Sequence, residues 1–325
     1  MKTLLVTDLH FSDRPYGTLD TQVECIERIF FEEKPTEVII MGDLTMHRKP
    51  TPSVLVALDK LIRTMEKTSE VVILRGNHDS ENRSDDGVTA LSLLRSEKVQ
   101  VICQTKKDEV KNRLYIPHYE DEEVIIKALQ TCSTDCVVFG HFGYVGCLNS
   151  RGDADFSIVL DRFNCRTYLG HIHRHRRDGL VTILGTPYTT NYGESGKECY
   201  YAILSDTGEE LKRITHGPRH LQVDVTSLLG DDNIFDYIND PEYTTSLRVL
   251  IEAGSSEIPY DKLDVYHIET RYKPAFDEDH ISNYSPKRDL FRLNEVIIED
   301  YVSSANTDIP TEVIMEGFKL LQDED

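Results

Sequence analysis

The sequence predicts an α/β fold built on a parallel sheet, and three observations lead to this prediction. Short apolar runs recur along the chain, stretches with helical periodicity separate the first of them, and several runs end in polar residues. Apolar strands that alternate with helices are typical of parallel sheets covered on both faces. Because the ligands of such folds gather at the carboxyl edge of the sheet, polar residues at the strand ends are the first candidates for function.

The chain begins with a strand and a crossover helix. We expect residues 3–7 to form the strand, and Asp8 and His10 follow its end on alternate positions, so both can face one metal ion. Residues 20–31 carry apolar side chains at helical spacing and predict the helix. An isolated Asp-x-His is more often structural than functional, so this pair gains meaning only from the motifs that follow.

The second strand is expected at residues 38–41, and it ends in Gly42 and Asp43. Asp43 is our candidate for a carboxylate shared by two metal ions. Thr51 as the N-cap, with proline after it, predicts a helix over residues 51–68.

A third strand, at residues 70–74, leads to Gly76, Asn77 and His78. The glycine lets the backbone approach a ligand closely. Asn77 offers a neutral carbonyl oxygen to a metal, and the imidazole of His78 is left for other work.

The same pattern recurs further along the chain. His141 follows the strand expected at residues 136–139, and His171 and His173 follow the one expected at residues 166–169. The other elements expected before residue 218 are helices at 87–96 and 121–130 and strands at 99–103, 114–117 and 181–184.

The chain beyond residue 217 differs in composition. Strands are expected at residues 221–225, 247–251 and 265–270, in a smaller α+β unit without metal-ligand clusters. We therefore expect four parts: a main domain (1–217), a small domain (218–272), a linker rich in charge, Pro, Asn and Ser (273–288), and two amphipathic helices (289–325).

Composition limits the class of protein. The 325 residues are 39% hydrophobic, which is enough for a sizeable core, and the formal net charge is −21. This charge opposes a DNA-binding module, because phosphate contacts need Lys and Arg, but a nuclease remains open if metals supply positive charge. The seven cysteines form no CxxC pair, and no apolar stretch is long enough to span a bilayer, so we expect a cytoplasmic protein with reduced thiols.

The polar residues at the strand ends comprise two carboxylates, one amide and four imidazoles, with His78 in addition. Imidazole with hard oxygen and without thiolate suits Mn, Fe or Zn. The set is too large for one tetrahedral site, and a shared carboxylate makes two sites natural. Two neighbouring metals activate a water and clamp an in-line displacement, so phosphoester hydrolysis is the chemistry they serve. Seven other histidines are expected to be ordinary surface or core residues: His47, His118, His175, His216, His220, His267 and His280.

Five motifs together resemble the sequence blocks of the calcineurin-like metallophosphoesterases: DLH at 8–10, GD at 42–43, GNHD at 76–79, GH at 140–141 and GHIH at 170–173. The resemblance covers about residues 1–215, and it is specific because both order and spacing match. It implies a four-layer αββα sandwich. It also implies a dinuclear centre with Asp8, His10 and His173 on one metal, Asn77, His141 and His171 on the other, and Asp43 bridging them. His78 would be the catalytic histidine, which protonates the leaving oxygen or orients the phosphate.

Within this family the chain is similar to the SbcD / Mre-eleven DNA-repair nucleases. The similarity rests on the GD-x-x-x-x-R-K-P string at 42–50, the loop at 140–146, the GTPY turn at 185–188 and the small α+β unit. The total length and the terminal helix pair resemble the short members found in T-even phages, and a phage or bacterial origin is left open. His47 stands one residue away from the histidine that the family commonly has in its second block, so its role is open.

This resemblance implies a Mn²⁺-dependent nuclease subunit (Mg²⁺, Fe²⁺ or Zn²⁺ being alternatives) that acts on DNA ends as a 3′→5′ exonuclease and single-strand endonuclease. The small domain would cap the site and help hold DNA, and the terminal helix-loop-helix would bind an SbcC-type coiled-coil ATPase. Family members form homodimers through the helices expected at 20–31 and 51–68. Arg174, Arg176 and Arg177 either contact a DNA phosphate or form a solvated face.

Two other functions stay open at this point. A nucleotide or cyclic-nucleotide phosphodiesterase on the same fold fits the acidic surface better, but it leaves residues 219–325 without a purpose. A non-enzymatic protein-binding scaffold fits less well, because every ligand position of the motifs is filled.

Overall fold

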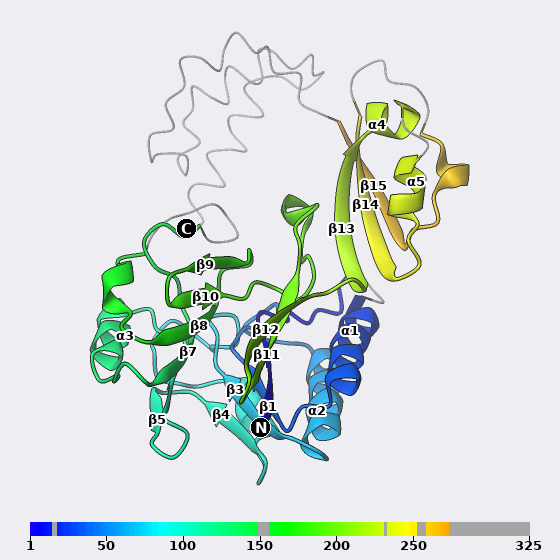
Figure 1. Ribbon diagram of the computed structural model, residues 1–325. Helices are drawn as coiled ribbons and strands as arrows, with labels where there is room; N and C mark the ends of the chain where they lie inside the picture. Colours follow the sequence, from blue (N-terminus) through cyan, green and yellow to red (C-terminus); the bar gives the residue numbers. More distant parts are fainter. Residues whose placement is uncertain (15–17, 149–155, 231–232, 252–257, 273–325) are drawn as a thin grey trace, which may run out of the picture. The chain divides into compact units, whose positions relative to one another are not determined.

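The computed structural model describes residues 1–14, 18–148, 156–230, 233–251 and 258–272 (Figure 1). The linker expected at 273–288 and the helix pair expected at 289–325 lie outside the described residues. In the described part of the chain, no helix combines the length and the apolar character needed to cross a membrane.

Two six-stranded sheets carry the motifs. The strands of the first sheet are β1 (Lys2–Val6), β2 (Glu37–Ile40), β3 (Glu70–Leu74), β4 (Val99–Ile102), β11 (Tyr200–Ser205) and β12 (Gly208–Arg213). Their order is β12-β11-β1-β2-β3-β4, and β1 to β4 are parallel. The carboxyl ends of β1, β2 and β3 therefore lie side by side, which brings the first three motifs to one edge.

The second sheet has a similar design. Its strands are β5 (Lys106–Asp108), β6 (Arg113–Ile116), β7 (Val137–His141), β8 (Arg166–Gly170), β9 (Arg176–Asp178) and β10 (Val181–Ile183). Their order is β5-β6-β7-β8-β10-β9, and β6, β7, β8 and β10 are parallel. The last two motifs thus follow neighbouring strands, β7 and β8.

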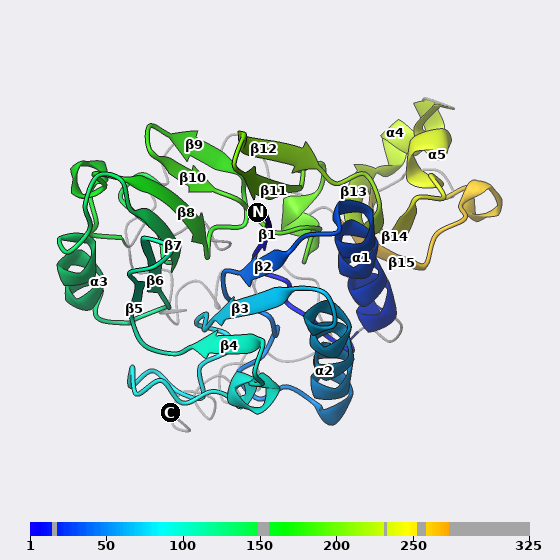
Figure 2. The same ribbon diagram turned by 60° about the horizontal axis from the view of Figure 1, so that its bottom comes forward.

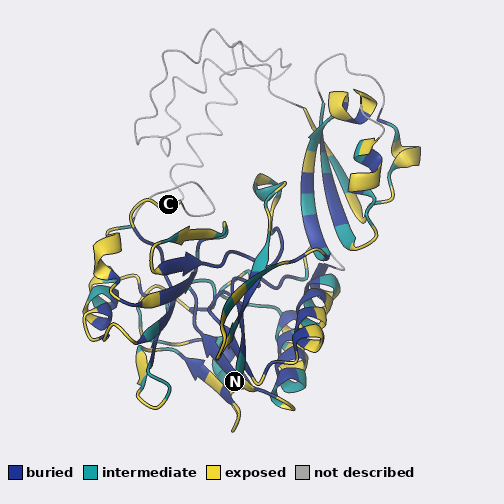
Figure 3. Ribbon diagram, viewed as in Figure 1, coloured by how far each residue is buried: buried dark blue, intermediate teal, exposed yellow. Residues whose placement is uncertain are grey.

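The helices complete a four-layer sandwich, as Figure 2 shows. Helices α1 (Thr18–Glu33) and α2 (Pro52–Glu66) cover the first sheet, and α3 (Glu122–Leu129) covers the second. Successive side chains of a strand point to opposite faces of the sheet, so each strand contributes to two apolar cores. Leu4 of β1 packs towards the helices, whereas Leu5 packs between the two sheets. The predicted αββα arrangement is confirmed, and the burial colours of Figure 3 follow the same layers.

A third, smaller sheet consists of β13 (Gly217–Asp224), β14 (Tyr243–Ile251) and β15 (His267–Tyr272), all parallel. Helices α4 (Val225–Gly230) and α5 (Asn233–Ile238) pack on it through their own apolar cluster. The three strands expected from the sequence are present. Their bounds differ slightly from the prediction: Val225 begins α4 instead of ending β13, and Val265 and Tyr266 precede β15.

Two other predictions of local structure need correction. Residues 87–96 do not form an α-helix; only the 3₁₀ helix η1 (Ala90–Leu94) is present, and Leu93 in it is 76% exposed, so the segment lacks a continuous apolar face. The hairpin of β11 and β12 was not expected from the sequence. By contrast, Thr51 is the N-cap of α2, as predicted, and its hydroxyl accepts a hydrogen bond from Val54 N at 3.5 Å.

Replacing Phe139 by alanine should strongly destabilise the sandwich. Its ring lies between the sheets and stacks on Tyr115 (5.6 Å between centroids) and on Tyr168 (5.7 Å). Removing a buried ring of this kind costs about 3–5 kcal/mol, and the urea midpoint should fall accordingly. Far-UV circular dichroism is the suitable probe because the chain has no tryptophan. Val110→Ala, at a side chain that is 96% exposed, is the matched control and should leave the midpoint unchanged.

Candidate metal centre

The loops that follow β1 and β2 run side by side past the end of the sheet. The amide of Asp8 donates to Gly42 O and the amide of His10 donates to Asp43 O, each at 2.9 Å. This pairing continues the parallel ladder beyond the strands. It brings the side chains of Asp8, His10 and Asp43 into one buried space.

The backbone of these loops is strained at the residues of interest. The φ angles of Asp8, His10, Asp43 and His171 are 53°, 45°, 50° and 77°, in the left-handed region that side chains other than glycine rarely adopt. Each such residue costs on the order of 1–3 kcal/mol, and such costs concentrate at functional sites. The strain at four residues after three strand ends is therefore a functional signal that is independent of residue type.

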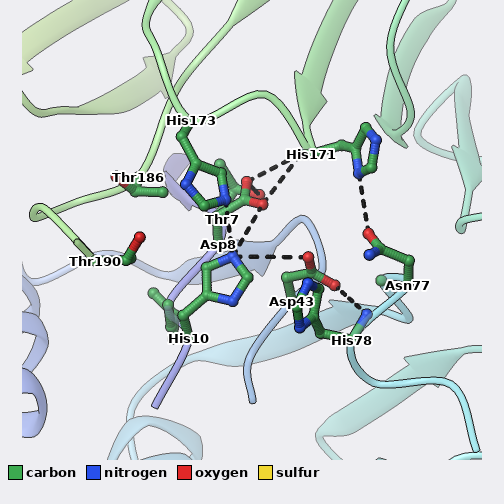
Figure 4. Close-up of polar contacts among 12 residues, drawn as sticks. Thr7, Asp8, His10, Asp43, Asn77, His78, His171, His173, Thr186 and Thr190 are labelled. Carbon is green, nitrogen blue, oxygen red and sulfur yellow. Dashed lines mark hydrogen bonds and ion pairs between the residues drawn. The ribbon is translucent and has the colours of Figure 1, made fainter. Parts of the chain in front are cut away.

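Glycine at position 76 allows the loop after β3 to approach Asp43. A Cβ atom there would lie 2.1 Å from Asp43 Oδ1 and 2.3 Å from Asp43 N. This close approach, predicted from the sequence, lets the amide of His78 donate to Asp43 Oδ1 at 2.8 Å (Figure 4).

Asp79 ties the same two loops together. One oxygen of its buried carboxylate accepts from the amides of Leu44 and Thr45 (3.0 and 3.1 Å), and the other accepts from Gly76 N at 2.9 Å. Burial and the neighbouring charge of Asp43 raise the pKa of Asp79. Its role is to fix the loops that carry Asp43 and His78, and the sequence signal for it was its place directly after the Asn-His pair.

The second sheet contributes imidazoles across the sandwich. His141, at the end of β7, donates from Nδ1 to Met41 O at 2.7 Å, since a carbonyl oxygen only accepts. Its Nε2 then lies 3.4 Å from Asp43 Oδ2 and 3.2 Å from Asn77 Oδ1. Asn77 Oδ1 is also 2.9 Å from Nδ1 of His171, which follows β8 (Figure 4).

His173 faces His10, with 3.0 Å between their Nε2 atoms. The other ring nitrogen of His173, Nδ1, lies 2.5 Å from Glu194 Oε1, which ends the short helix η3 (Tyr192–Glu194). Burial would raise the pKa of Glu194, but His173 and the buried Lys197, 2.8 Å from Glu194 Oε2, lower it to about 2. An ionised carboxylate at this position fixes the tautomer and the orientation of the His173 ring.

Three overlapping groups of possible metal ligands result: Asp8, His10 and His173; His10, Asp43 and His78; and Asp43, His141 and His171. Within each group the ligand atoms lie within 4.8 Å of one another. Asp43 links the group around His10 to the group around His141. The structure thus brings together every residue that the sequence motifs proposed for a dinuclear centre, including Asn77.

The donor set fits a pair of divalent cations. Because Nδ1 of His141 and Nδ1 of His173 donate to their outer hydrogen-bond partners, both Nε2 atoms face the centre, where a bound cation would take the place of any Nε2 proton. There they lie beside carboxylate and amide oxygens, which only accept. Divalent cations would satisfy all of these acceptors at once, and imidazole with carboxylate is a ligand set typical of Mn, Fe or Zn.

The ionisable side chains of the centre have pKa values shifted in different directions. Burial opposes ionisation of Asp8, but the imidazoles of His10 and His141 lower its pKa to about 2, and the pKa of Asp43 lies well below its ordinary value for a similar reason. Burial also opposes a charge on His141, yet Asp43 outweighs it and raises the pKa to about 9. His171, whose pKa burial lowers to about 4, is neutral and ready to act as a ligand.

His78 occupies a distinct position beside the centre. Its Nδ1 donates to Met46 O at 2.6 Å, and its ring stands edge-on to His10, with 4.9 Å between centroids. The half-buried ring therefore keeps Nε2 available for a substrate.

The other candidates lie further out. His47 is exposed, and among the described residues only its carbonyl makes a contact, with Thr45 Oγ1. Arg176 pairs with Asp178 and donates to Gly146 O, and Arg177 pairs with Glu209 at 2.8 Å. Arg174 is exposed and has no ion pair within the described ranges.

Sequence reasoning missed three residues around the centre. Glu194 and Lys197 gave no signal, because no motif surrounds them and Glu194 lies 21 residues after His173. His118 was expected to be ordinary, yet its ring stacks on His171 (5.7 Å between centroids) and stands edge-on to His141 (6.2 Å). Burial, with these two neighbours, lowers the pKa of His118 to about 3, so the ring is neutral.

Two pockets adjoin the centre. One, of about 430 Å³, is lined by His173 together with Arg174, His175, Arg176 and Lys197, and also by Glu194 and the apolar side chains of Cys147, Leu148 and Ile172; we call it the cationic pocket. The other, of about 480 Å³, is lined by His118, Phe156, Ser157 and residues 119–123; we call it the His118 pocket.

Comparison with known proteins gives one family. The sequence model of the calcineurin-like phosphoesterases matches residues 1–175. Among solved structures, the chain is similar to the nuclease MPE of Pseudomonas putida (18% identity over 61% of this chain and 83% of that one, TM-score 0.31). It is also similar to an archaeal phosphodiesterase (14%, 66% and 99%, 0.35) and to a dimetal phosphatase of Danio rerio (13%, 66% and 98%, 0.39). At these TM-scores the three structures carry no argument about activity.

Replacing Glu194 by glutamine should weaken metal binding at Asp8, His10 and His173. The amide keeps the shape but removes the charge that orients the His173 ring, and such outer partners are worth about 10–100-fold in metal affinity. Isothermal titration of the metal-free protein with Mn²⁺ measures the change. Glu210→Gln, at a side chain that is 65% exposed, is the control. Equal affinities in the two variants would show that Glu194 has no such role.

Proposed function

The chain belongs to the calcineurin-like phosphoesterase family, and we propose that it is a metal-dependent DNA nuclease subunit with 3′→5′ exonuclease and single-strand endonuclease activity. The family hydrolyses phosphoesters at a dinuclear metal centre, for which this chain supplies candidate ligand groups. DNA as the substrate is our inference. It draws on the cationic pocket and on the SbcD-like sequence features.

The observation that carries the proposal is the charge of the cationic pocket. The whole chain has a net charge of −21, yet the pocket that opens beside His173 gathers Arg174, Arg176 and Lys197. Lys197 and Arg176 are partly neutralised by Glu194 and Asp178, whereas Arg174 is exposed and has no such partner in the described part of the chain. In a strongly acidic protein, a cationic pocket beside the metal centre favours binding of a polyanionic strand at that place.

The chain's own residues have separate tasks. When bound, the metal pair (Mn²⁺ in our proposal, with Mg²⁺, Fe²⁺ or Zn²⁺ as alternatives) polarises the phosphoryl group and lowers the pKa of a water. His78 is held by Met46 O through Nδ1, so that its Nε2 faces the substrate and gives a proton to the leaving oxygen. Arg174 binds a neighbouring phosphate and positions the strand.

The proposal extends to partners. Residues 218–272 would cap the site and hold DNA, and the helix pair expected from the sequence at 289–325 would bind an SbcC-type ATPase. A homodimer would form through α1 and α2, whose Phe31 and Val56 are more than half exposed, at 56% and 53%. We infer action in the cytoplasm, or in the host cytoplasm for a phage protein, which agrees with seven unpaired cysteines.

A nucleotide or cyclic-nucleotide phosphodiesterase is the second candidate. The four carboxylates that line the His118 pocket are compatible with it, because their charge disfavours a second phosphate on that side. A small substrate with one phosphodiester would satisfy this limit as well as the end of a DNA strand does.

The experiment compares substrates for the full chain with and without Mn²⁺. We expect degradation of labelled double-stranded and hairpin DNA from the ends, dependent on Mn²⁺ and abolished by EDTA. Cyclic AMP should be a poor substrate, and bis-p-nitrophenyl phosphate reports the intact centre. Hydrolysis of cyclic AMP without DNA degradation would overturn the nuclease proposal in favour of the second candidate.

Replacing His78 by glutamine should lower kcat on DNA by about 10²–10⁴-fold, which is the usual contribution of a general acid. Mn²⁺ binding should persist, since the ligands of both proposed sites remain. Glu210→Gln, at a side chain of β12 that is 65% exposed, is the control and should retain full activity. A protein-binding scaffold would show no turnover in the parent chain and no difference between the two variants.

A further inference from the structure

We propose that the His118 pocket binds the terminal nucleoside of the strand, that is, an uncharged base and sugar, while the rest of the strand lies in the cationic pocket. This inference rests on the proposed function and specifies how its substrate is placed. It gives the pocket a ligand class and gives His118 and Phe156 a role in positioning that ligand.

The topology places this pocket next to the centre. Strands β6, β7 and β8 are neighbours in the second sheet and parallel, and a histidine ends or closely follows each of them: His118, His141 and His171. The register pairs Ile116 with Gly140 and His141 with Gly170, so these histidines share one edge. A ligand beside His118 is therefore one ring away from the ligands of the second metal site.

The pocket offers ring surfaces. The His118 ring stacks on His171 with 30° between their planes, and Phe156 stands edge-on to His171, with 5.8 Å between centroids. Both ring nitrogens of His118 are buried and have no hydrogen-bond partner among the described residues. The 15% of the side chain that stays exposed is therefore carbon, which with Phe156 forms an aromatic surface suited to a nucleobase.

Charge excludes a phosphate from the same place. Glu120, Asp121, Glu122 and Glu123 line the pocket, and no Lys or Arg does so among the residues described. Two arginines lie beside the lining: the guanidinium of Arg48 is 3.5 Å from Glu120, and that of Arg75 donates to His118 O and lies 5.9 Å from the centre of the Tyr119 ring, so the four carboxylates outnumber the adjoining cations. An uncharged nucleoside with N–H and O–H donors fits this rim, whereas a continuing phosphodiester chain is repelled.

The walls of the pocket are fixed by local hydrogen bonds. The amide of His118 donates to Arg75 O at 2.9 Å, which joins its loop to the one that carries Asn77. On the other side, Ser157 N donates to Glu122 Oε2 at 2.8 Å. The ring surfaces are thus held in place beside the centre before a ligand arrives.

The test measures binding of thymidine 5′-monophosphate, deoxyribose 5-phosphate and inorganic phosphate to the Mn²⁺-loaded full chain, by calorimetry and by inhibition of bis-p-nitrophenyl phosphate hydrolysis. Stacking of one base predicts that the nucleotide binds roughly 10–100-fold more tightly than the sugar phosphate. Phe156→Leu and His118→Ala should reduce this ratio to nearly one. His118→Phe keeps a ring and should preserve it, with unchanged Mn²⁺ affinity in all variants.

A second measurement addresses the charge. Thymidine 3′,5′-bisphosphate should bind several-fold less tightly than the 5′-monophosphate, and Glu123→Gln should narrow that difference, whereas the exposed Glu97→Gln should not. Equal binding of nucleotide and sugar phosphate by the parent chain, or an unchanged ratio in Phe156→Leu, would overturn the proposal even if DNA is degraded. If the base preference holds but DNA is not degraded, the pocket assignment stands and the nuclease assignment fails.

Discussion

The structure depends on the contact between one carboxylate of the first sheet and the imidazoles of the second. Asp43 is buried, lies 3.4 Å from Nε2 of His141 and receives the amide of His78. A buried carboxylate is costly unless charge and hydrogen bonds compensate it, and here the compensating groups come from segments about a hundred residues apart in the chain. The site exists only when both sheets are complete and correctly stacked.

This constraint explains why the surroundings are so rigid. The apolar layer between the sheets, with Phe139 stacked between Tyr115 and Tyr168, sets the separation of the two edges. At the edge itself, Asp79 and Glu194 fix the loop of Asp43 and the ring of His173. The strained φ angles of Asp8, His10 and Asp43 lie in loops that are paired by the bonds from Asp8 N to Gly42 O and from His10 N to Asp43 O, which helps to hold them. Ligands held in this way lose little freedom when a cation binds.

The sequence predicted the parts of this arrangement that depend on residues close together in the chain. Apolar runs and the residues after them located β1, β2, β3, β7 and β8, and the metal-ligand candidates follow these strands. Glu194 and the ring surface of His118 could not be predicted, because their roles arise from packing between segments that no short motif connects. The 3₁₀ helix η1 was mistaken for an α-helix because periodicity alone does not show that Leu93 has nothing to pack against. The carboxylate partners of Arg176 and Arg177, Asp178 and Glu209, could not be predicted either, and contact of these arginines with a DNA phosphate stays a prediction.

The cationic pocket and the His118 pocket differ in charge, and this difference bears on how a strand would be oriented at the centre. Arg174, Arg176 and Lys197 line the pocket on the side of His173 and would stabilise phosphates, whereas the carboxylates that line the pocket on the side of His118 would repel them. A strand that passes through the centre would have to place a phosphate on each side, which is unfavourable, whereas the end of a strand places phosphates only on the cationic side. The proposed exonuclease activity at ends would therefore be favoured by electrostatics, and the proposed single-strand endonuclease activity would be the weaker of the two. In the proposed reaction the same asymmetry would orient the substrate relative to His78, since the leaving oxygen would belong to the strand in the cationic pocket, while the released nucleotide would keep the scissile phosphate.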